Sequence, residues 1–257
     1  MVARFPVLDA PLPLAIAHRG GASSWPENTM PAFQGAVDLG FRFLETDVHR
    51  TADGVLVAFH DDRLDRVTDR TGLIAELPYD EVAKALVDGR EPIPRFEELL
   101  NAFPNVRFNI DPKADDAVEP LAAVLQQTGS VDRVCVGAFS DARLERMREL
   151  CGPELCTSLG PRKVMQLVAA SKPGIGRVVR PRFVEGAAQV PHRAKGVTVV
   201  TGGFVDTAHQ LGLQVHVWTI DDPVEMHQLL DLGVDGLMTD QPAVLKAVLQ
   251  ARGVWVD

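Results

Sequence analysis

Residues 14–33 read LAIAHRGGASSWPENTMPAF and contain one complete unit of a pattern that recurs along the chain. The apolar run LAIAH at 14–18 predicts a buried strand. Residues 30–40 predict a helix, because their apolar residues have helical spacing and Gly40 stands just past the end. A strand, a loop and a helix in this order form the building unit of parallel α/β folds.

Further apolar runs alternate with helical patterns along the rest of the chain. Additional strands are predicted at 42–49, 106–111, 133–139, 155–160, either 177–183 or 196–201, 214–220 and 236–240. Eight such units predict a parallel sheet that closes into a (β/α)₈ TIM barrel of the α/β class. An open doubly wound sheet is the alternative, but the fingerprint G-x-G-x-x-G does not follow the first strand.

One segment interrupts this alternation after the second strand. Asp53-Gly54 is a hairpin signal, so the run VLVAFH at 55–60 is expected to fold back antiparallel to strand 42–49. The following residues are rich in turn signals and contain a short helical pattern at 79–86. We therefore expect a small insertion over residues 50–95 within a single domain that spans 1–257.

Composition and charge argue against several classes of protein. The net charge of −9 and the pI near 5.3 argue against a nucleic-acid binder, which would present a basic face. The three cysteines are odd in number and form no C-x-x-C pair, which indicates reduced thiols in a cytosolic compartment. No apolar run approaches the ~20 residues of a membrane helix, and prolines interrupt any signal peptide. The sequence predicts a soluble, cytoplasmic protein without stable membrane association, and it does not predict the oligomeric state.

Acidic side chains stand at the ends of two predicted strands, where TIM barrels carry their chemistry. Residues two apart on a strand point to the same face, so Glu45 and Asp47 share one face, as do Asn109, Asp111 and Lys113. Burying neighbouring carboxylates without a partner is unfavourable, and a divalent cation removes this repulsion. Carboxylate oxygens suit Mg²⁺ or Ca²⁺ better than zinc.

Two histidines stand at the ends of predicted strands. His18 ends the first strand and His60 ends the hairpin arm, and an imidazole titrates near neutral pH. The pair therefore qualifies as a general base and a general acid. Arg19, Lys113 and a metal would hold a phosphate, and the glycine pair at 20–21 would allow a sharp turn and the approach of an oxyanion.

Structural roles stay open as alternatives for part of this set. They are ion pairs of Glu45 and Asp47 with Arg19 and Lys113 without a metal, helix capping by residues 27–29, barrel packing by Trp218, and capping of the last helix by Asp240. His49 shares the face of Asp47 and is a weaker site candidate, whereas His216 is expected to be structural.

Taken together, the motifs resemble the glycerophosphodiester phosphodiesterase (GDPD) family. The resemblance extends from about residue 14 to residue 247 and rests on AHRGGASSWPENTMPAF, LETDVHRTADGVLVAFHDDRLDRVT, NIDPK, VHVWTI and GLMTDQP in this order. It implies a TIM barrel with a small insertion after the second strand. It also implies hydrolysis of a small-molecule substrate, a glycerophosphodiester, to glycerol 3-phosphate and an alcohol.

The resemblance implies a role for each matching residue. The roles are catalytic acid and base for His18 and His60, metal ligand for Glu45, Asp47 and Asp111, phosphate contact for Arg19 and Lys113, and an aromatic near the substrate for Trp218. The cofactor would be one divalent ion, Mg²⁺ or Ca²⁺, with Mn²⁺ as a further candidate. The family usually has N-I-E-x-K where this chain has N-I-D-P-K, so the third ligand, Asp111, is one methylene shorter. This departure bears on the affinity and identity of the metal. The resemblance also implies that Glu27 and Asn28 help to shape the site.

Two alternative functions follow from the same motifs. The first is a lysophospholipase D-like activity, which needs an apolar entrance, and Trp25 and Phe204 are the apolar side chains that the sequence offers for it. The second is a barrel that binds phosphorylated ligands without catalysis. Because both histidines and the E-x-D pair are present, the hydrolase is the preferred hypothesis.

Overall fold

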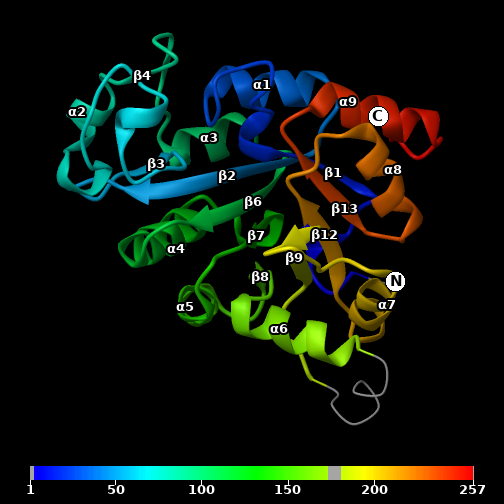
Figure 1. The fold of residues 1–257 in the computed structure, drawn as a ribbon. Helices are drawn as coiled ribbons and strands as arrows, with labels where there is room; N and C mark the ends of the chain where they lie inside the picture. Colours follow the sequence, from blue (N-terminus) through cyan, green and yellow to red (C-terminus); the bar gives the residue numbers. More distant parts are fainter. Residues whose placement is uncertain (1–2, 173–180, 257) are drawn as a thin grey trace.

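In the computed structural model, which describes residues 3–172 and 181–256, eight parallel strands form a barrel (Figure 1). They are β1 (Leu14–Ala17), β2 (Phe43–Arg50), β6 (Arg107–Pro112), β7 (Val134–Val136), β8 (Cys156–Thr157), β9 (Ala187–Pro191), β12 (Gln214–Trp218) and β13 (Gly236–Thr239). The strands pair in the order β8-β7-β6-β2-β1-β13-β12-β9, and a parallel bridge between Ser158 and Ala187 joins the two ends of this row. The prediction of a TIM barrel is confirmed.

Helices lie on the outside of the barrel (Figure 1). They are α1 (Met30–Asp38), α3 (Phe96–Ala102), α4 (Val118–Gln127), α5 (Asp141–Cys151), α6 (Pro161–Ala170), α7 (Gly202–Gln210), α8 (Pro223–Asp231) and α9 (Pro242–Ala251). The structure also contains short 3₁₀ helices outside the insertion: η1 (Pro6–Leu8), η2 (His18–Gly20), η5 (Asp115–Ala117) and η6 (Val131–Arg133). Across the two described ranges, none of the helices combines the length and the apolar character needed to span a bilayer.

Strand β2 shows how the sequence separates the core from the interior of the barrel. Leu44 and Val48 are fully buried in the main apolar core with residues of the surrounding helices. Glu45 and Asp47 alternate with them and line a cavity inside the barrel. The period of two along the strand therefore places the acidic side chains where the sequence predicts them.

The other end of the barrel is closed by the N-terminal segment. Phe5, Val7 and Leu8 pack in an apolar cluster with Leu14 and Phe43, which begin their strands. The lower interior of the barrel is thus filled with side chains, as in other TIM barrels, and the cavity lies towards the carboxyl ends of the strands.

The segment at residues 50–95 lies beyond the end of β2, at one side of the barrel (Figure 1). Strand β3 (Leu56–Ala58) pairs antiparallel with β2, as the Asp53-Gly54 signal predicts. The segment also contains η3 (Leu64–Arg66), η4 (Ile74–Glu76), α2 (Tyr79–Val82), β4 (Leu86–Val87) and β5 (Glu91–Pro92). These elements surround an apolar cluster of their own, which includes Phe59 and Ile74. The cluster holds β3 in place, and His60 directly follows Phe59, a member of this cluster.

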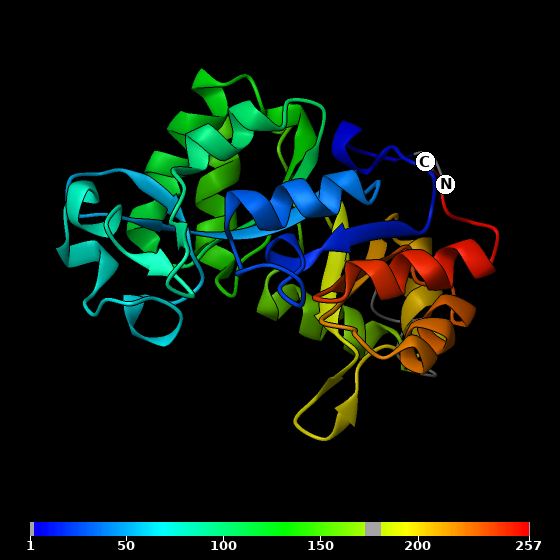
Figure 2. The same ribbon diagram turned by 90° about the horizontal axis from the view of Figure 1, so that it is seen from above.

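The prediction of the sixth strand is wrong. Strand β9 lies between the two candidate runs, 177–183 and 196–201, and residues 177–180 lie outside the described residues. The second run contributes only to an outer hairpin of β10 (Arg193–Ala194) and β11 (Val197–Thr198) that projects from the barrel (Figure 2). Val197 is 63% exposed, whereas Ala187 of β9 is fully buried. Burial against the rest of the barrel, and not β-propensity, therefore decides which run completes the sheet.

Candidate active site

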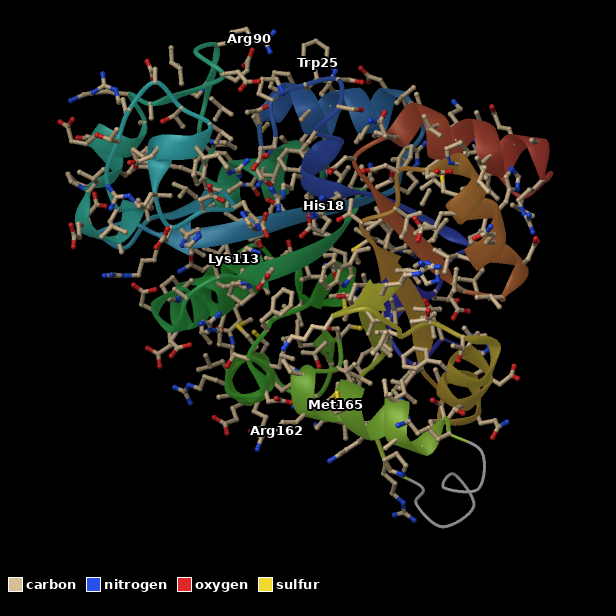
Figure 3. All side chains as sticks on the ribbon, in the orientation of Figure 1. His18, Trp25, Arg90, Lys113, Arg162 and Met165 are labelled. Carbon is tan, nitrogen blue, oxygen red and sulfur yellow. The ribbon has the colours of Figure 1, made fainter. Side chains whose placement is uncertain are left out.

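A cavity of about 340 Å³ opens at the carboxyl ends of the barrel strands. Its lining includes the eight side chains for which the resemblance implies catalysis, metal binding or substrate contact: His18, Arg19, Glu45, Asp47, His60, Asp111, Lys113 and Trp218. They come from β2, from β6 and the residue after it, from β12, and from the segments that follow β1 and β3. Figure 3 shows His18 and Lys113 on the side of the barrel that carries β2 and β6. The fold thus brings these distant residues to one place.

The turn after β1 explains why this strand ends in His-Arg-Gly-Gly. Arg19 has a φ of 52° within η2, and Gly20 follows with a φ of 80°. A Cβ at position 20 would lie only 2.9 Å from the main-chain nitrogen of Phe33 in α1. Glycine therefore lets the turn approach α1 closely, and this contact holds His18 and Arg19 at the cavity.

His18 is held by a carboxylate that sequence reasoning assigned elsewhere. Its Nδ1 lies 2.8 Å from Oδ1 of Asp240, and its Nε2 lies 3.7 Å from Oε2 of Glu45. Burial lowers the pKa of His18, but the negative charges of Glu45 and Asp240 outweigh burial and raise it overall. The expectation that Asp240 caps the last helix is wrong, because the N-cap residue of α9 is Gln241. Since β13 pairs with β1, the residue that follows β13 reaches the imidazole.

His60 is held both through its ring and through its main chain. Its Nδ1 lies 2.6 Å from Oδ1 of Asp61. Hydrogen bonds from Arg66 are the main reason why the pKa of Asp61 falls to about 2, so this carboxylate is ionised at neutral pH. His49 donates from Nε2 to the main-chain oxygen of His60 at 3.0 Å. His49 therefore positions the His60 main chain.

Asp47 is the carboxylate that the two cations of the cavity neutralise. Nζ of Lys113 lies 2.7 Å from Oδ1 of Asp47 and 2.9 Å from Oδ2 of Asp111. Asp111 on β6 is the register partner of Asp47 on β2. Nε of Arg19 lies 3.4 Å from Oδ2 of Asp47. Burial raises the pKa of Asp47, but the charges of Lys113 and Arg19 outweigh it and lower the pKa. For Asp47, the structure thus contains the ion pairs that the alternative without a metal requires.

Glu45 and Asp111 are less well neutralised. Glu45 is buried and accepts a hydrogen bond from the main-chain nitrogen of Arg19 at 3.1 Å. Burial and the charge of Asp47 raise the pKa of Glu45 to about 7. Burial also raises the pKa of Asp111, whose Oδ1 is buried without a hydrogen-bond partner among the described residues. Both carboxylates would be stabilised by an additional positive charge.

The chemistry of these donors fits a hard divalent cation. Glu45, Asp47 and Asp111 offer carboxylate oxygens, and the orphaned oxygen of Asp111 has unused acceptor capacity. Within residues 3–172 and 181–256, no three acidic, histidine or cysteine side chains already form a converged ligand group. The ammonium group of Lys113 contacts both Asp47 and Asp111. Binding of a metal here therefore requires Lys113 to share or release one of these carboxylates.

Glu27 and Asn28 contact the site and do not cap α1 through their side chains. Oε1 of Glu27 accepts a hydrogen bond from Arg19 at 3.0 Å, and Nδ2 of Asn28 donates to Oδ2 of Asp47 at 3.3 Å. The N-cap residue of α1 is Thr29, whose side chain makes no capping bond. The two residues therefore orient Arg19 and Asp47.

An aromatic pair forms part of the wall of the cavity. The ring centroids of Trp218 and Phe139 lie 5.7 Å apart in an edge-to-face arrangement, and both residues line the cavity. Sequence reasoning missed Phe139, because a strand over 133–139 would have placed it inside the sheet. Strand β7 ends at Val136, and Phe139 is 69% exposed in the loop that follows. The short length of β7 is a property of the packed barrel, and the local sequence gave no signal for it.

The sequence model of the glycerophosphoryl diester phosphodiesterase family matches residues 18–244. The chain belongs to this family. A Mycobacterium tuberculosis protein named probable glycerophosphodiester phosphodiesterase 2 is 41% identical over 94% of this chain and 92% of its own length. The human protein lysophospholipase D GDPD1 is 29% identical over 91% of this chain and 85% of its own length. The predicted resemblance, and with it the prediction of a phosphodiesterase, is confirmed at the level of the family.

Solved structures share the fold of this GDPD-family chain. A phosphodiesterase from Oleispira antarctica, solved in complex with its product sn-glycerol-3-phosphate, superimposes with a TM-score of 0.78 and 24% sequence identity. The match covers 93% of this chain and 97% of the other. A protein from Silicibacter pomeroyi, named putative glycerophosphoryl diester phosphodiesterase, gives a TM-score of 0.79 at 24% identity over 97% of this chain and 99% of the other.

In this GDPD barrel, a row of amide and imidazole groups runs below the carboxylates. Gln189 donates from Nε2 to Oδ1 of Asn109 at 2.6 Å, and the same nitrogen lies 3.3 Å from Nδ1 of His216. Nε2 of His216 donates to Oε1 of Gln214 at 3.1 Å, and Gln214 donates to the main-chain oxygen of Leu8 at 3.2 Å. Complete burial lowers the pKa of His216 to about 4, so its imidazole is neutral at pH 7.

We expect His216 to make the fold acid-sensitive. Its folded pKa of about 4 lies below its ordinary value of 6.5, so the unfolded state binds more protons between these values. The contribution of neutral His216 to the free energy of unfolding is therefore complete above pH 6.5 and is lost as the pH falls towards 4. Between pH 7 and pH 5, the free energy of unfolding should fall by about 2 kcal/mol more in the wild-type chain than in His216→Gln.

Urea unfolding at these two pH values measures the difference. His227→Gln, which changes a histidine on α8 outside the cavity, is the matched control and should follow the wild type. The same pH dependence in the wild-type chain and in His216→Gln would show that His216 titrates normally in the folded state.

Proposed function

We propose that this GDPD-family chain hydrolyses glycerophosphodiesters to glycerol 3-phosphate and an alcohol, with a divalent metal ion and two histidines as general acid and base. One observation carries the proposal. His18 and His60, each bound through Nδ1 to an aspartate, line one cavity with Glu45, Asp47 and Asp111. Carboxylates on Nδ1 fix both rings and leave the two Nε2 atoms for proton transfer with a substrate.

The basic residues of the cavity supply the phosphate contacts. Arg19 and Lys113 line the cavity, and both contact the carboxylate of Asp47. Glu45, Asp47 and Asp111 would hold the metal, which supplies charge neutralisation to the phosphodiester and stabilises negative charge that develops in the transition state. Lys113 contacts both Asp47 and Asp111, so a metal held by these carboxylates would leave its ammonium group available to the phosphate oxygens.

The two histidines divide the proton transfers. One imidazole removes the proton from the attacking oxygen, which forms the new bond to phosphorus. Attack by water gives glycerol 3-phosphate directly, whereas attack by the glycerol 2-hydroxyl gives a cyclic phosphate that a water molecule then opens to glycerol 3-phosphate. The other imidazole donates a proton to the oxygen of the leaving alcohol as the P–O bond breaks. Asp240 and Asp61 keep the tautomers in place and stabilise whichever imidazole carries the positive charge.

A lysophospholipase D activity is the second candidate, because three mammalian relatives carry that name and Phe139 presents an exposed ring at the cavity. The sequence-based candidates for its apolar entrance fit poorly: Phe204 is fully buried, and Trp25 lies outside the cavity lining. Trp25 and the exposed Met165 of α6 lie at opposite edges of the molecule (Figure 3), so they do not form one interfacial patch. A water-soluble substrate is therefore preferred.

Turnover by the purified chain tests this proposal. Glycerophosphocholine and glycerophosphoethanolamine should release glycerol 3-phosphate in the presence of Mg²⁺, at rates well above those with lysophosphatidylcholine as the substrate. Faster turnover of lysophosphatidylcholine would favour the lysophospholipase D. Binding of glycerol 3-phosphate without turnover of any diester, under each of Mg²⁺, Ca²⁺ and Mn²⁺, would favour the barrel that binds but does not hydrolyse.

A further inference from the structure

A small polar niche lies in the cavity beside Gly137, in the loop after β7. A Cβ at Gly137 would lie 3.0 Å from Oε1 of Gln189, 3.5 Å from Oγ of Ser158 and 3.8 Å from Nδ2 of Asn109. All four residues line the cavity. Because position 137 is a glycine, the space where a side chain would begin is left open to a ligand.

The row of hydrogen bonds below the site fixes which atoms face this niche. Nε2 of Gln189 is engaged by Oδ1 of Asn109 and Nδ1 of His216, which leaves Oε1 of Gln189 as a free acceptor. Asn109 accepts through Oδ1, which leaves its Nδ2 as a free donor. Oγ of Ser158 also has no hydrogen-bond partner among the described residues. The niche therefore presents a donor, an acceptor and a hydroxyl that serves as either.

The chemistry of the niche selects a neutral polar group. None of its three side chains carries a charge, so it offers nothing specific to a carboxylate, a phosphate or an ammonium group. A ligand hydroxyl both donates and accepts, and it pairs with Oε1 of Gln189, Nδ2 of Asn109 and Oγ of Ser158. Leaving these groups unpaired against an apolar ligand group would be unfavourable.

The position of the niche relates it to the carboxylates. Asn109 is the register partner of Glu45, and Asp111, two residues further along β6, is the partner of Asp47. Two residues of a strand span about 7 Å. If the phosphate of the ligand lies at the level of Asp47 and Asp111, an attached three-carbon polyol is long enough to reach the level of Asn109.

We propose that the niche formed by Gly137, Asn109, Ser158 and Gln189 binds the terminal hydroxyl of the glycerol moiety and sets the specificity of the site for that moiety. This inference rests on the proposed function. The alcohol of the second ester then points towards the wall formed by Phe139 and Trp218. The site accordingly recognises the glycerol end of its substrate by hydrogen bonds and offers mainly aromatic contacts to the other end.

Binding of two phosphate monoesters tests the niche without catalysis. Glycerol 3-phosphate and n-propyl phosphate share the phosphate and the three-carbon chain, and only the first carries the hydroxyls. Calorimetry on the full chain with Mg²⁺ should show about tenfold tighter binding of glycerol 3-phosphate. Ser158→Ala and Gly137→Ala should each reduce this ratio to about threefold or less, with the affinity for n-propyl phosphate retained.

Gly202→Ala is the matched control, because a Cβ at Gly202 meets no atom within 4 Å and the residue lies outside the cavity. It should keep the wild-type ratio, and a thermal melt of each variant confirms that it is folded. Equal binding of the two phosphates by the wild type, or a ratio unchanged in both niche variants, would overturn the niche but not the phosphodiesterase. Failure of the wild type to bind either phosphate would overturn the proposed function and the niche together.

Discussion

His18→Ala and His60→Ala should each reduce kcat for glycerophosphocholine by about a thousandfold. Each substitution removes one proton-transfer group from the cavity and leaves its aspartate partner, Asp240 or Asp61, without an imidazole to orient. Both histidines lie at the cavity and not in the main apolar core, so the fold should persist. Steady-state kinetics with circular dichroism on the same samples measures both effects.

The matched control is His227→Ala on α8, whose imidazole contacts Arg252 and lies outside the cavity lining. It should keep kcat within a factor of about two, because it touches no part of the reacting cavity. Near-normal turnover in both His18→Ala and His60→Ala would end the two-histidine mechanism. A loss confined to KM would assign the histidines to binding and not to proton transfer.

Removal of divalent ions should abolish turnover, and Mg²⁺, Ca²⁺ or Mn²⁺ should restore it. The buried Oδ1 of Asp111 has no hydrogen-bond partner among the described residues, and Glu45 is buried beside Asp47. A cation would satisfy both groups. Glu45→Gln keeps the size of the side chain and removes its charge, so it should lower kcat by at least about a hundredfold and weaken metal binding.

Thermal unfolding separates metal binding from activity. Mg²⁺ should raise the melting temperature of the wild type and of Glu145→Gln, an exposed position on α5, and should raise that of Glu45→Gln much less. If EDTA leaves turnover unchanged and no divalent ion shifts the melting temperature, Lys113 and Arg19 alone neutralise the carboxylates. In that case the ion pairs of Asp47 describe the working site.

Local patterns predicted the parts of the structure that depend on local physics. The alternation of Leu44 and Val48 with Glu45 and Asp47 placed the acidic pair inside the barrel, because successive strand residues point to opposite faces. The Asp53-Gly54 signal predicted the antiparallel return of β3. The eight side chains that the resemblance assigned to catalysis, metal binding and substrate contact all line the cavity.

Features that depend on packing between distant elements were missed. Asp240 reaches His18 only because β13 closes against β1, and nothing in the sequence around Asp240 distinguishes this contact from a helix cap. Strand β9 (Ala187–Pro191) follows Gly186, and a Cβ on Gly186 would lie 2.8 Å from Sγ of Cys156. This close contact with the neighbouring strand β8 is not visible in the local sequence. Phe139 enters the cavity because β7 is short.

In the proposed mechanism, one imidazole removes a proton and the other donates one to the leaving alcohol. A glycerophosphodiester whose leaving group is p-nitrophenol separates these two roles, because this group departs without protonation. With this substrate, kcat should recover substantially in one of the two variants, His18→Ala or His60→Ala, and stay low in the other. Equal recovery in both variants, or recovery in neither, would contradict a division of acid and base between these two histidines.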